Sequence, residues 1–161
     1  MFKGVNTSGT IRQLTNEFNL SNLAATKLLS TVGQFAHAMG QSKEYVGQFS
    51  AGLSKSAADY AAYMGLSGAQ EINDVGRKFA KATLGEVGEL KDLGINIDVT
   101  SQKFQQLVKD IQATTGASEA QAKQMAIAKD IIKQVEYTAG SASSGMLDGW
   151  KQLNILIDNF K

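Results

Sequence analysis

The stretch Thr83-Leu-Gly-Glu-Val-Gly-Glu-Leu-Lys-Asp-Leu-Gly-Ile-Asn-Ile-Asp98 divides the chain into the helices that precede it and those that follow it. Gly85 and Gly88 interrupt a polar–apolar helical pattern, and Gly94 ends a Leu-Lys-Asp-Leu turn. The next residues, Ile95–Val99, alternate between apolar and polar side chains. One strand of this length cannot form a sheet, so we expect an extended loop that leads into a helix cap.

Outside this stretch, apolar residues recur three and four positions apart, which is the periodicity of amphipathic α-helices. The predicted helices begin near Thr10, Ser21, Ser42, Ser67, Glu86, Thr100 or Ser101, Ser118 and Met146. Three of these starts, Thr10–Gln13, Ser67–Gln70 and Ser118–Gln121, have the form of a capping box. The glycines that we expect to end helices, besides Gly94, are Gly40, Gly65, Gly116 and Gly140. Because the connections are short, the sequence predicts an all-α fold, an irregular bundle of about six to seven short antiparallel helices.

The domain organisation follows from the same pattern. Residues 1–19 are predicted to be a flexible or short-helix lead-in, and residues 20–161 to form one helical domain. The chain stops inside the amphipathic pattern Leu153–Lys161, so we expect this domain to be a piece of a longer protein. Four further glycines lie inside helical stripes, at Gly33, Gly47, Gly52 and Gly76. Close packing of neighbouring helices is the favoured explanation for them, and helices that bend or unfold in use are the alternative.

Composition restricts the classes of function. The 161 residues include 43% hydrophobic side chains, enough to bury a core. The 16 basic residues are matched by 15 acidic ones, and this balance argues against a nucleic-acid-binding or anionic-membrane-binding protein. Cysteine is absent, which removes disulfides and thiolate metal sites. No apolar run approaches the length of a membrane span, and the N-terminus lacks the apolar region of a secretory signal.

The sequence offers little chemistry for catalysis. His37 is the only histidine, so neither a metal nor a cofactor is expected. Glu86, Glu89 and Asp92 lie three residues apart and could be interpreted as the carboxylates of a glycosidase. We favour a solvated face, because a lytic site needs one carboxyl group in apolar surroundings. The serines lie at helix starts, and no nucleophile or nucleotide-binding motif is present, so the prediction is that the chain is not an enzyme.

The order of elements carries a family resemblance. Phe79-Ala-Lys-Ala precedes the glycine break, and the break is followed by the alanine-rich run Gln124–Gly140 and by Met146-Leu-Asp-Gly-Trp-Lys-Gln-Leu. This order resembles the helical region of bacteriophage tail tape-measure proteins, over roughly Leu20 to Phe160. Those proteins carry a helix, a small-residue break with L-x-x-L-G-I, an alanine-rich helix with T-x-x-A-x-G and a final helix.

The resemblance implies a virion structural protein that runs through the tail during assembly, sets tail length and is ejected with the genome. Its partners would be tail-tube, tail-tip or baseplate proteins, tail assembly chaperones and further copies of itself. It would reside in the tail lumen or tip, and in the host cytoplasm during assembly. The expected site residues are structural: the glycines of the break and of a hinge at residues 140–145, and the apolar anchors around them. They are Gly85, Gly88, Gly94, Gly140, Gly145, Phe79, Leu93, Ile95 and Trp150.

An alternative from a different class is a stand-alone helical adaptor, or a secreted bacterial helical protein that binds a partner through an exposed stripe. The W-x-G turn typical of small secreted helical hairpins is absent, because Trp150 is followed by Lys151 and Gln152. The break also interrupts the long heptad pattern that is common in tape-measure proteins. If the resemblance holds, this region is therefore expected at an end of the tape measure, as a compact docking or delivery element.

Overall fold

The computed structural model describes residues 7–17, 20–37, 43–66 and 68–139. These ranges contain six α-helices and one 3-10 helix and no β-strand, so the predicted all-α bundle is confirmed. The helices are α1 (Thr7–Glu17), α2 (Asn22–His37), α3 (Lys43–Tyr63), α4 (Ala69–Thr83), η1 (Val87–Leu93), α5 (Gln102–Thr115) and α6 (Glu119–Ala139). The predicted hinge at Gly140–Gly145 and the predicted last helix with Trp150 lie outside the described residues.

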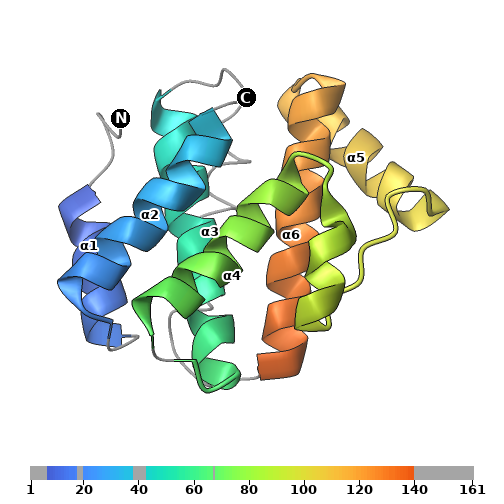
Figure 1. Cartoon of the computed structure of the whole chain (residues 1–161). Helices are drawn as coiled ribbons and strands as arrows, with labels where there is room; N and C mark the ends of the chain where they lie inside the picture. The colour runs from blue at the N-terminus through green and yellow to red at the C-terminus, as the bar shows by residue number, and fades with distance from the viewer. Residues whose placement is uncertain (1–6, 18–19, 38–42, 67, 140–161) are drawn as a thin grey trace.

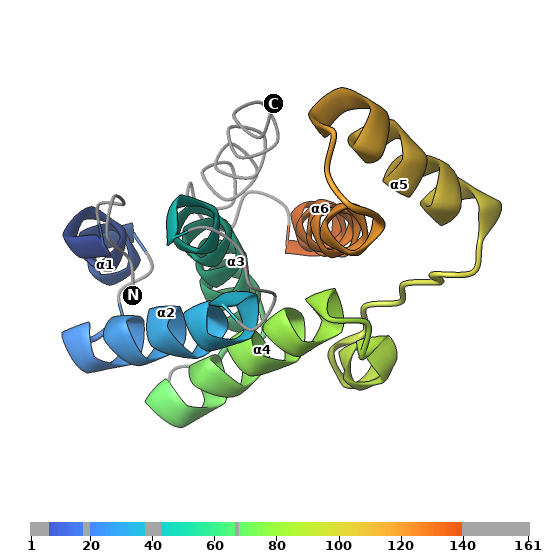
Figure 2. The same ribbon diagram turned by 90° about the horizontal axis from the view of Figure 1, so that it is seen from above.

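Helix α3 is the centre of the bundle. It contacts α1, α2, α4 and α6, and the two views in Figures 1 and 2 show these helices around it. Every residue from Val46 to Ala61 is buried except the half-buried Gln48. The sequence predicted only one buried stripe on this helix, ending at Met64. That prediction was too narrow, and it was wrong for Met64, whose side chain is exposed at the end of the helix.

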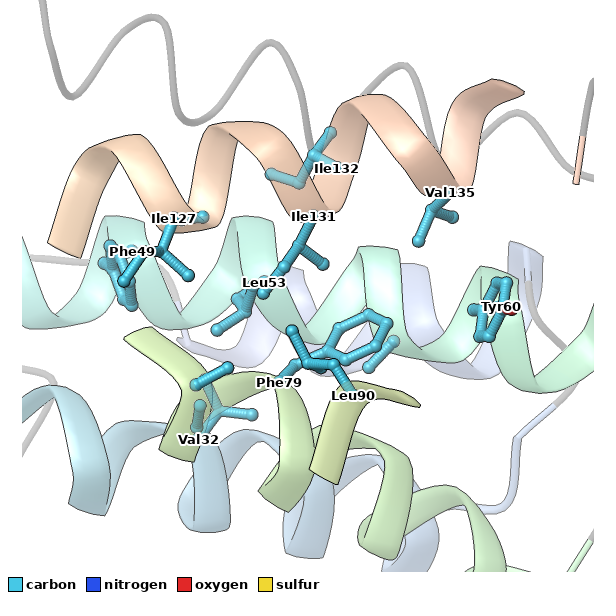
Figure 3. Packing of buried hydrophobic residues seen from close by; sticks show 14 of the residues in the cluster. Val32, Phe49, Leu53, Tyr60, Phe79, Leu90, Ile127, Ile131, Ile132 and Val135 are labelled. Atoms are coloured by element: carbon cyan, nitrogen blue, oxygen red, sulfur yellow. The ribbon is translucent and has the colours of Figure 1, made fainter. Parts of the chain in front are cut away.

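The apolar core extends from α3 into all its neighbours. In Figure 3 the side chains of Ile127, Ile131 and Val135 of α6 point toward α3 and α4. Phe79 of α4 and Leu90 of η1 lie together below them, and both are fully buried. Leu14 of α1 also belongs to this cluster, so the short helix of the lead-in packs on the same core as the predicted domain.

Helices α2 and α4 lie side by side and run in the same direction, as Figure 1 shows. Lys27 Nζ donates a hydrogen bond to Gln70 Oε1 (3.0 Å), and Thr31 Oγ1 donates one to Asn73 Oδ1 (2.7 Å). Residue numbers therefore rise together along the two helices. This parallel pairing follows from the alternating directions of α2, α3 and α4.

Gly76 allows the close approach of α2 and α4. A Cβ atom at this position would lie 2.2 Å from Leu28 Cδ1 and 3.4 Å from Val32 Cγ2. Both of those side chains are fully buried, so neither has free space to move into. The close-packing interpretation is thus confirmed for Gly76.

Three of the predicted helix starts have the expected side-chain caps. Ser21 Oγ accepts a hydrogen bond from Ala24 N, and Ser101 Oγ accepts one from Phe104 N, both at 3.1 Å. Ser118 and Gln121 form a full capping box, in which each main-chain N–H donates to the other residue's side chain (3.1 and 3.2 Å).

Two predicted starts differ from the structure. Helix α1 begins at Thr7, so the predicted capping box at Thr10 lies inside it. Helix α4 begins at Ala69, and its N-cap, Gly68, has no side chain that could form a cap. The Gln70 side chain, which the predicted box assigned to capping, accepts a hydrogen bond from Lys27 instead.

Candidate functional site

The glycine-rich break folds into a short 3-10 helix that lies against α4. Because a 3-10 helix has about three residues per turn, side chains three positions apart share one face. Val87, Leu90 and Leu93 form the inner face, with Leu90 at 0% and Leu93 at 8% exposure. The outer edge carries the carboxylates that sequence analysis singled out, which are Glu86, Glu89 and Asp92.

These three carboxylates, which we term the acidic face, pair with a basic stripe on α4 formed by Arg77, Lys78 and Lys81. Lys81 Nζ lies 3.1 Å from Glu89 Oε2 and 3.8 Å from Glu86 Oε2. Lys78 Nζ lies 3.9 Å from Asp92 Oδ2, and Arg77 Nη1 lies 4.0 Å from Glu89 Oε2.

Asp74 extends this network along α4. Its carboxylate lies 2.6 Å from Arg77 Nη2 and 3.3 Å from Lys78 Nζ. Asp74 thereby holds two of the three cations in position for η1. Asp74, the basic stripe and the acidic face make one ladder of ion pairs across two helices.

The electrostatics of the acidic face do not suit glycoside hydrolysis. The Lys81 ammonium that hydrogen-bonds Glu89 holds the pKa of that carboxyl below its usual range. A general acid in a glycosidase needs the opposite shift, which comes from apolar surroundings. Glu89 is half-buried beside two cations, so its geometry favours an ionised carboxylate with a structural role.

The two glycines that flank η1 have left-handed or related backbone conformations. Gly85 has φ = +104° and Gly94 has φ = +76°, values that L side chains rarely adopt. Gly94 is the C-cap of η1, and its N–H donates to Lys91 O (3.0 Å). Gly88 lies within η1, where an added Cβ atom would meet no atom within 4 Å. Gly85 and Gly94 thus set the direction of the chain at both ends of η1.

The extended segment after Gly94 has the alternation that the sequence predicted. Ile95 and Ile97 are buried, whereas Asn96 and Asp98 are exposed. Gln134 of α6 holds this segment with a reciprocal pair of hydrogen bonds. Its Nε2 donates to Asn96 O (2.8 Å), and its Oε1 accepts from Asn96 N (3.3 Å). The segment therefore lies along α6 before it reaches α5.

Asp98 forms the turn into α5. Its Oδ1 accepts hydrogen bonds from Thr100 Oγ1 (2.6 Å) and Thr100 N (3.0 Å), while its carbonyl oxygen accepts one from Ser101 Oγ. The hydrogen bond from the Thr100 hydroxyl is the main reason that the pKa of Asp98 is lowered. Ser101 then caps the helix, as the sequence predicted.

An open groove of about 1180 Å³ lies between α5, α6 and this extended segment. Figure 2 shows these three elements on the right of the molecule. Phe104 and Leu107 supply apolar lining, and Tyr137 at 92% exposure is a prominent aromatic group beside it. The charged lining residues are Lys103, Lys129 and Lys133 together with Asp98, Asp110, Asp130 and Glu136. Both signs of charge are thus mixed along the walls, which does not favour a polyanionic ligand.

The structure brings together six of the nine residues expected to matter. Phe79, Leu93 and Ile95 lie in the core around η1, Gly88 lies within η1, and Gly85 and Gly94 flank it. The other three, Gly140, Gly145 and Trp150, lie outside the described residues. Sequence reasoning missed the partners of the acidic face on α4 and the role of Gln134. The three-residue spacing of the carboxylates, which matches the pitch of a 3-10 helix, was the available signal for the former.

The described part of the chain contains neither a cluster of metal ligands nor a helix suited to a membrane. Across residues 7–17, 20–37, 43–66 and 68–139, no three His, Cys, Asp or Glu side chains are grouped so that they could hold a metal ion. Within the same ranges, no helix combines the length and the apolar character needed to cross a membrane. The comparisons with protein families, with curated proteins and with solved structures found no match for this chain.

Proposed function

We propose that this chain is a structural, non-catalytic part of a bacteriophage tail tape-measure protein, and that it acts in tail assembly and genome delivery. The observation that carries the proposal is the order of elements around the glycine break. Helix α4 with Phe79 is followed by Leu90-Lys-Asp-Leu-Gly-Ile95 and then by the alanine-rich helix α6, as in the family that the sequence resembles.

Within such a protein, we assign this region to a compact module instead of an extended ruler. Contacts between residues far apart in the sequence support this assignment. Thr31 meets Asn73, Tyr60 meets Leu93, and Asn96 meets Gln134, each across more than 30 positions. A continuous helix makes only local contacts, because its hydrogen bonds join residues four apart. The module would dock on tail-tube, tail-tip or baseplate proteins, or on assembly chaperones, within the virion.

The test is to determine where the protein resides in an infected cell. Tails purified by density gradient from the phage or prophage that encodes this sequence are analysed by quantitative mass spectrometry. The proposal expects peptides from this chain to co-purify with the tail-tube protein at a constant ratio. A host enzyme of similar abundance serves as the control for carry-over. Expression during infection without any of these peptides in purified tails would contradict the proposal.

A second candidate function is that of a helical adaptor that binds a peptide segment of another protein. The groove between α5 and α6 favours this candidate, because it combines apolar lining, mixed charges and the exposed Tyr137. Gene organisation separates the two candidates. A reading frame of more than ~600 residues beside tail-tube and baseplate genes supports the tail protein, since a long chain is needed to span a tail at ~1.5 Å per residue. A short free-standing gene supports the adaptor.

A further inference from the structure

The attachment of η1 differs from that of the central helices. Among the described helices, the backbone of η1 packs against α4 alone, and α3 reaches it only through the side-chain hydrogen bond from Tyr60, whereas α3 packs against four other helices. The chain on both sides of η1 passes through a glycine with positive φ, Gly85 and Gly94. No atom would meet a Cβ at Gly85 within 4 Å, and only Tyr60 Oη, at 3.7 Å, would meet one at Gly94. Neither flanking glycine is therefore tightly packed, so changes of φ and ψ there meet no close neighbour, although Leu90 and Leu93 must leave the core when η1 moves.

Buried leucines, one hydrogen bond and a set of ion pairs together hold η1 in place. Leu90 and Leu93 are its only buried side chains, and Tyr60 adds one hydrogen bond to the carbonyl oxygen of Leu93. The remaining attachment is the set of ion pairs between the acidic face and the basic stripe on α4. The side chains of Glu86 and Asp92 are 63% and 70% exposed, so dissolved ions have access to them. The Glu89 side chain is 37% exposed, but its Oε2 atom, which faces Lys81 and Arg77, is buried. Salt screens pairs of this kind, because the Debye length falls from about 10 Å at 0.1 M to about 3 Å at 1 M.

We propose that Leu84–Ser101 is a salt-sensitive latch, in which η1 opens away from α4 before the rest of the described core unfolds. The ion pairs of the acidic face set how often it opens. Opening exposes the inner face of η1 and the side of α4 that carries Phe79, which lies against Leu90 in Figure 3. It also lengthens the tether of α5, whose only helix contact in the described ranges is with α6. The latch thus couples ionic strength to the exposure of an apolar surface.

Hydrogen–deuterium exchange of the complete chain, read by mass spectrometry at 50 mM and 500 mM NaCl, tests the latch. Peptides that cover 84–101 are compared with peptides from α3 and α6. The latch requires faster exchange in 84–101 than in α3 at low salt. Exchange in 84–101 should accelerate further at high salt, by roughly two- to fivefold, as expected when exposed ion pairs are lost. Exchange in α3 should change less.

Variants identify the ion pair responsible. Lys81→Gln and Glu89→Gln should each accelerate exchange in 84–101 and reduce its response to salt. The effect of the double variant should be smaller than the sum of the two single effects, because both changes remove the Lys81–Glu89 pair while each also removes one weaker pair, Lys81–Glu86 or Arg77–Glu89. Glu119→Gln is the matched control, since it removes an ion pair within α6 (Glu119–Lys123, 3.5 Å) that does not reach η1. It should leave exchange in 84–101 unchanged.

Two results would overturn the latch. One is exchange in 84–101 that matches α3 at both salt concentrations, which would mean that the segment opens only by global unfolding. The other is faster local exchange that responds neither to salt nor to the Lys81 and Glu89 variants, which would mean that ion pairs do not control it. The proposal depends only on this geometry, so its failure would leave the proposed tail function untouched.

Discussion

The hydroxyl group of Tyr60 in α3 donates a hydrogen bond to the main-chain carbonyl oxygen of Leu93 at the end of η1. The two residues are 33 positions apart, and both are buried. Burial, with a smaller contribution from nearby Tyr63, raises the pKa of Tyr60, so the hydroxyl stays protonated and able to donate. This bond ties the glycine break directly to the central helix.

Replacing Tyr60 by Phe should therefore lower the free energy of unfolding by about 1–2 kcal/mol, because the buried carbonyl oxygen of Leu93 loses its donor. Urea denaturation followed by circular dichroism measures the change. Tyr137→Phe is the control. Because Tyr137 is 92% exposed, this change should alter the free energy of unfolding by no more than about 0.5 kcal/mol. A Tyr60→Phe variant as stable as the parent would show that the bond contributes nothing.

Gly76→Ala should destabilise the fold by about 1–3 kcal/mol, even though alanine is the better helix former. The reason is the 2.2 Å contact that a new Cβ atom would make with Leu28 Cδ1. Gly88→Ala is the matched control, because the space around Gly88 is open and its stability should be unchanged or slightly higher. If thermal melting shows the two variants to be equally stable, α2 and α4 do not pack as closely as described.

Gly94→Ala should cost about 1–2 kcal/mol, because alanine is strained at φ = +76°. Asparagine tolerates this conformation better, so Gly94→Asn should lose less stability than Gly94→Ala. Chemical denaturation of both variants measures which of them is the more stable. An equal loss in the two variants would indicate a steric cause instead of a backbone cause.

Acid should weaken the ladder of ion pairs on α4. The hydrogen bond from Arg77, with help from Lys78, holds the pKa of Asp74 below its usual range, and Lys81 does the same for Glu89. A carboxyl group whose pKa is lower in the folded state than in the unfolded state stabilises the fold at any pH above its unfolded-state pKa, which is near 4. This stabilisation is lost as the pH falls through the folded-state pKa.

Urea unfolding at pH 7, 5, 4 and 3 tests whether stability falls with pH in this way. Asp74→Asn should lower stability at pH 7 and should make the remaining decline between pH 5 and 3 shallower than in the parent. A variant that loses stability in acid as steeply as the parent would show that Asp74 does not contribute to that dependence.

Local signals in the sequence predicted a large part of this fold. Ser21, Ser101 and Ser118 cap helices because a hydroxyl before an apolar run satisfies free N–H groups, and this effect needs no tertiary information. Gly94 and Gly116 end helices with positive φ for an equally local reason. The alternation in Ile95–Val99 correctly indicated that Ile95 and Ile97 face the core, but it was wrong for Val99, which is exposed.

The remaining features depend on which helices meet. Lys55 and Asp59 of α3 are fully buried, and a single apolar stripe could not reveal that this helix is surrounded on all sides. The pairing of Glu89 with Lys81 depends on the direction in which the chain turns at Gly85, and the sequence does not specify this direction. The groove arises because α5 contacts α6 and no other described helix, a relation between distant elements that periodicity does not encode.

We propose that this region is a compact module of a phage tail protein and not part of its ruler. As one continuous helix, 161 residues would span about 240 Å at ~1.5 Å per residue, whereas a compact domain of this size has a radius of gyration of about 15 Å. The most direct test is to delete the region in frame from the parent gene and to measure tail lengths by electron microscopy. The compact module predicts impaired assembly or infection with tail length nearly unchanged; viable phage with tails about 240 Å shorter would contradict it.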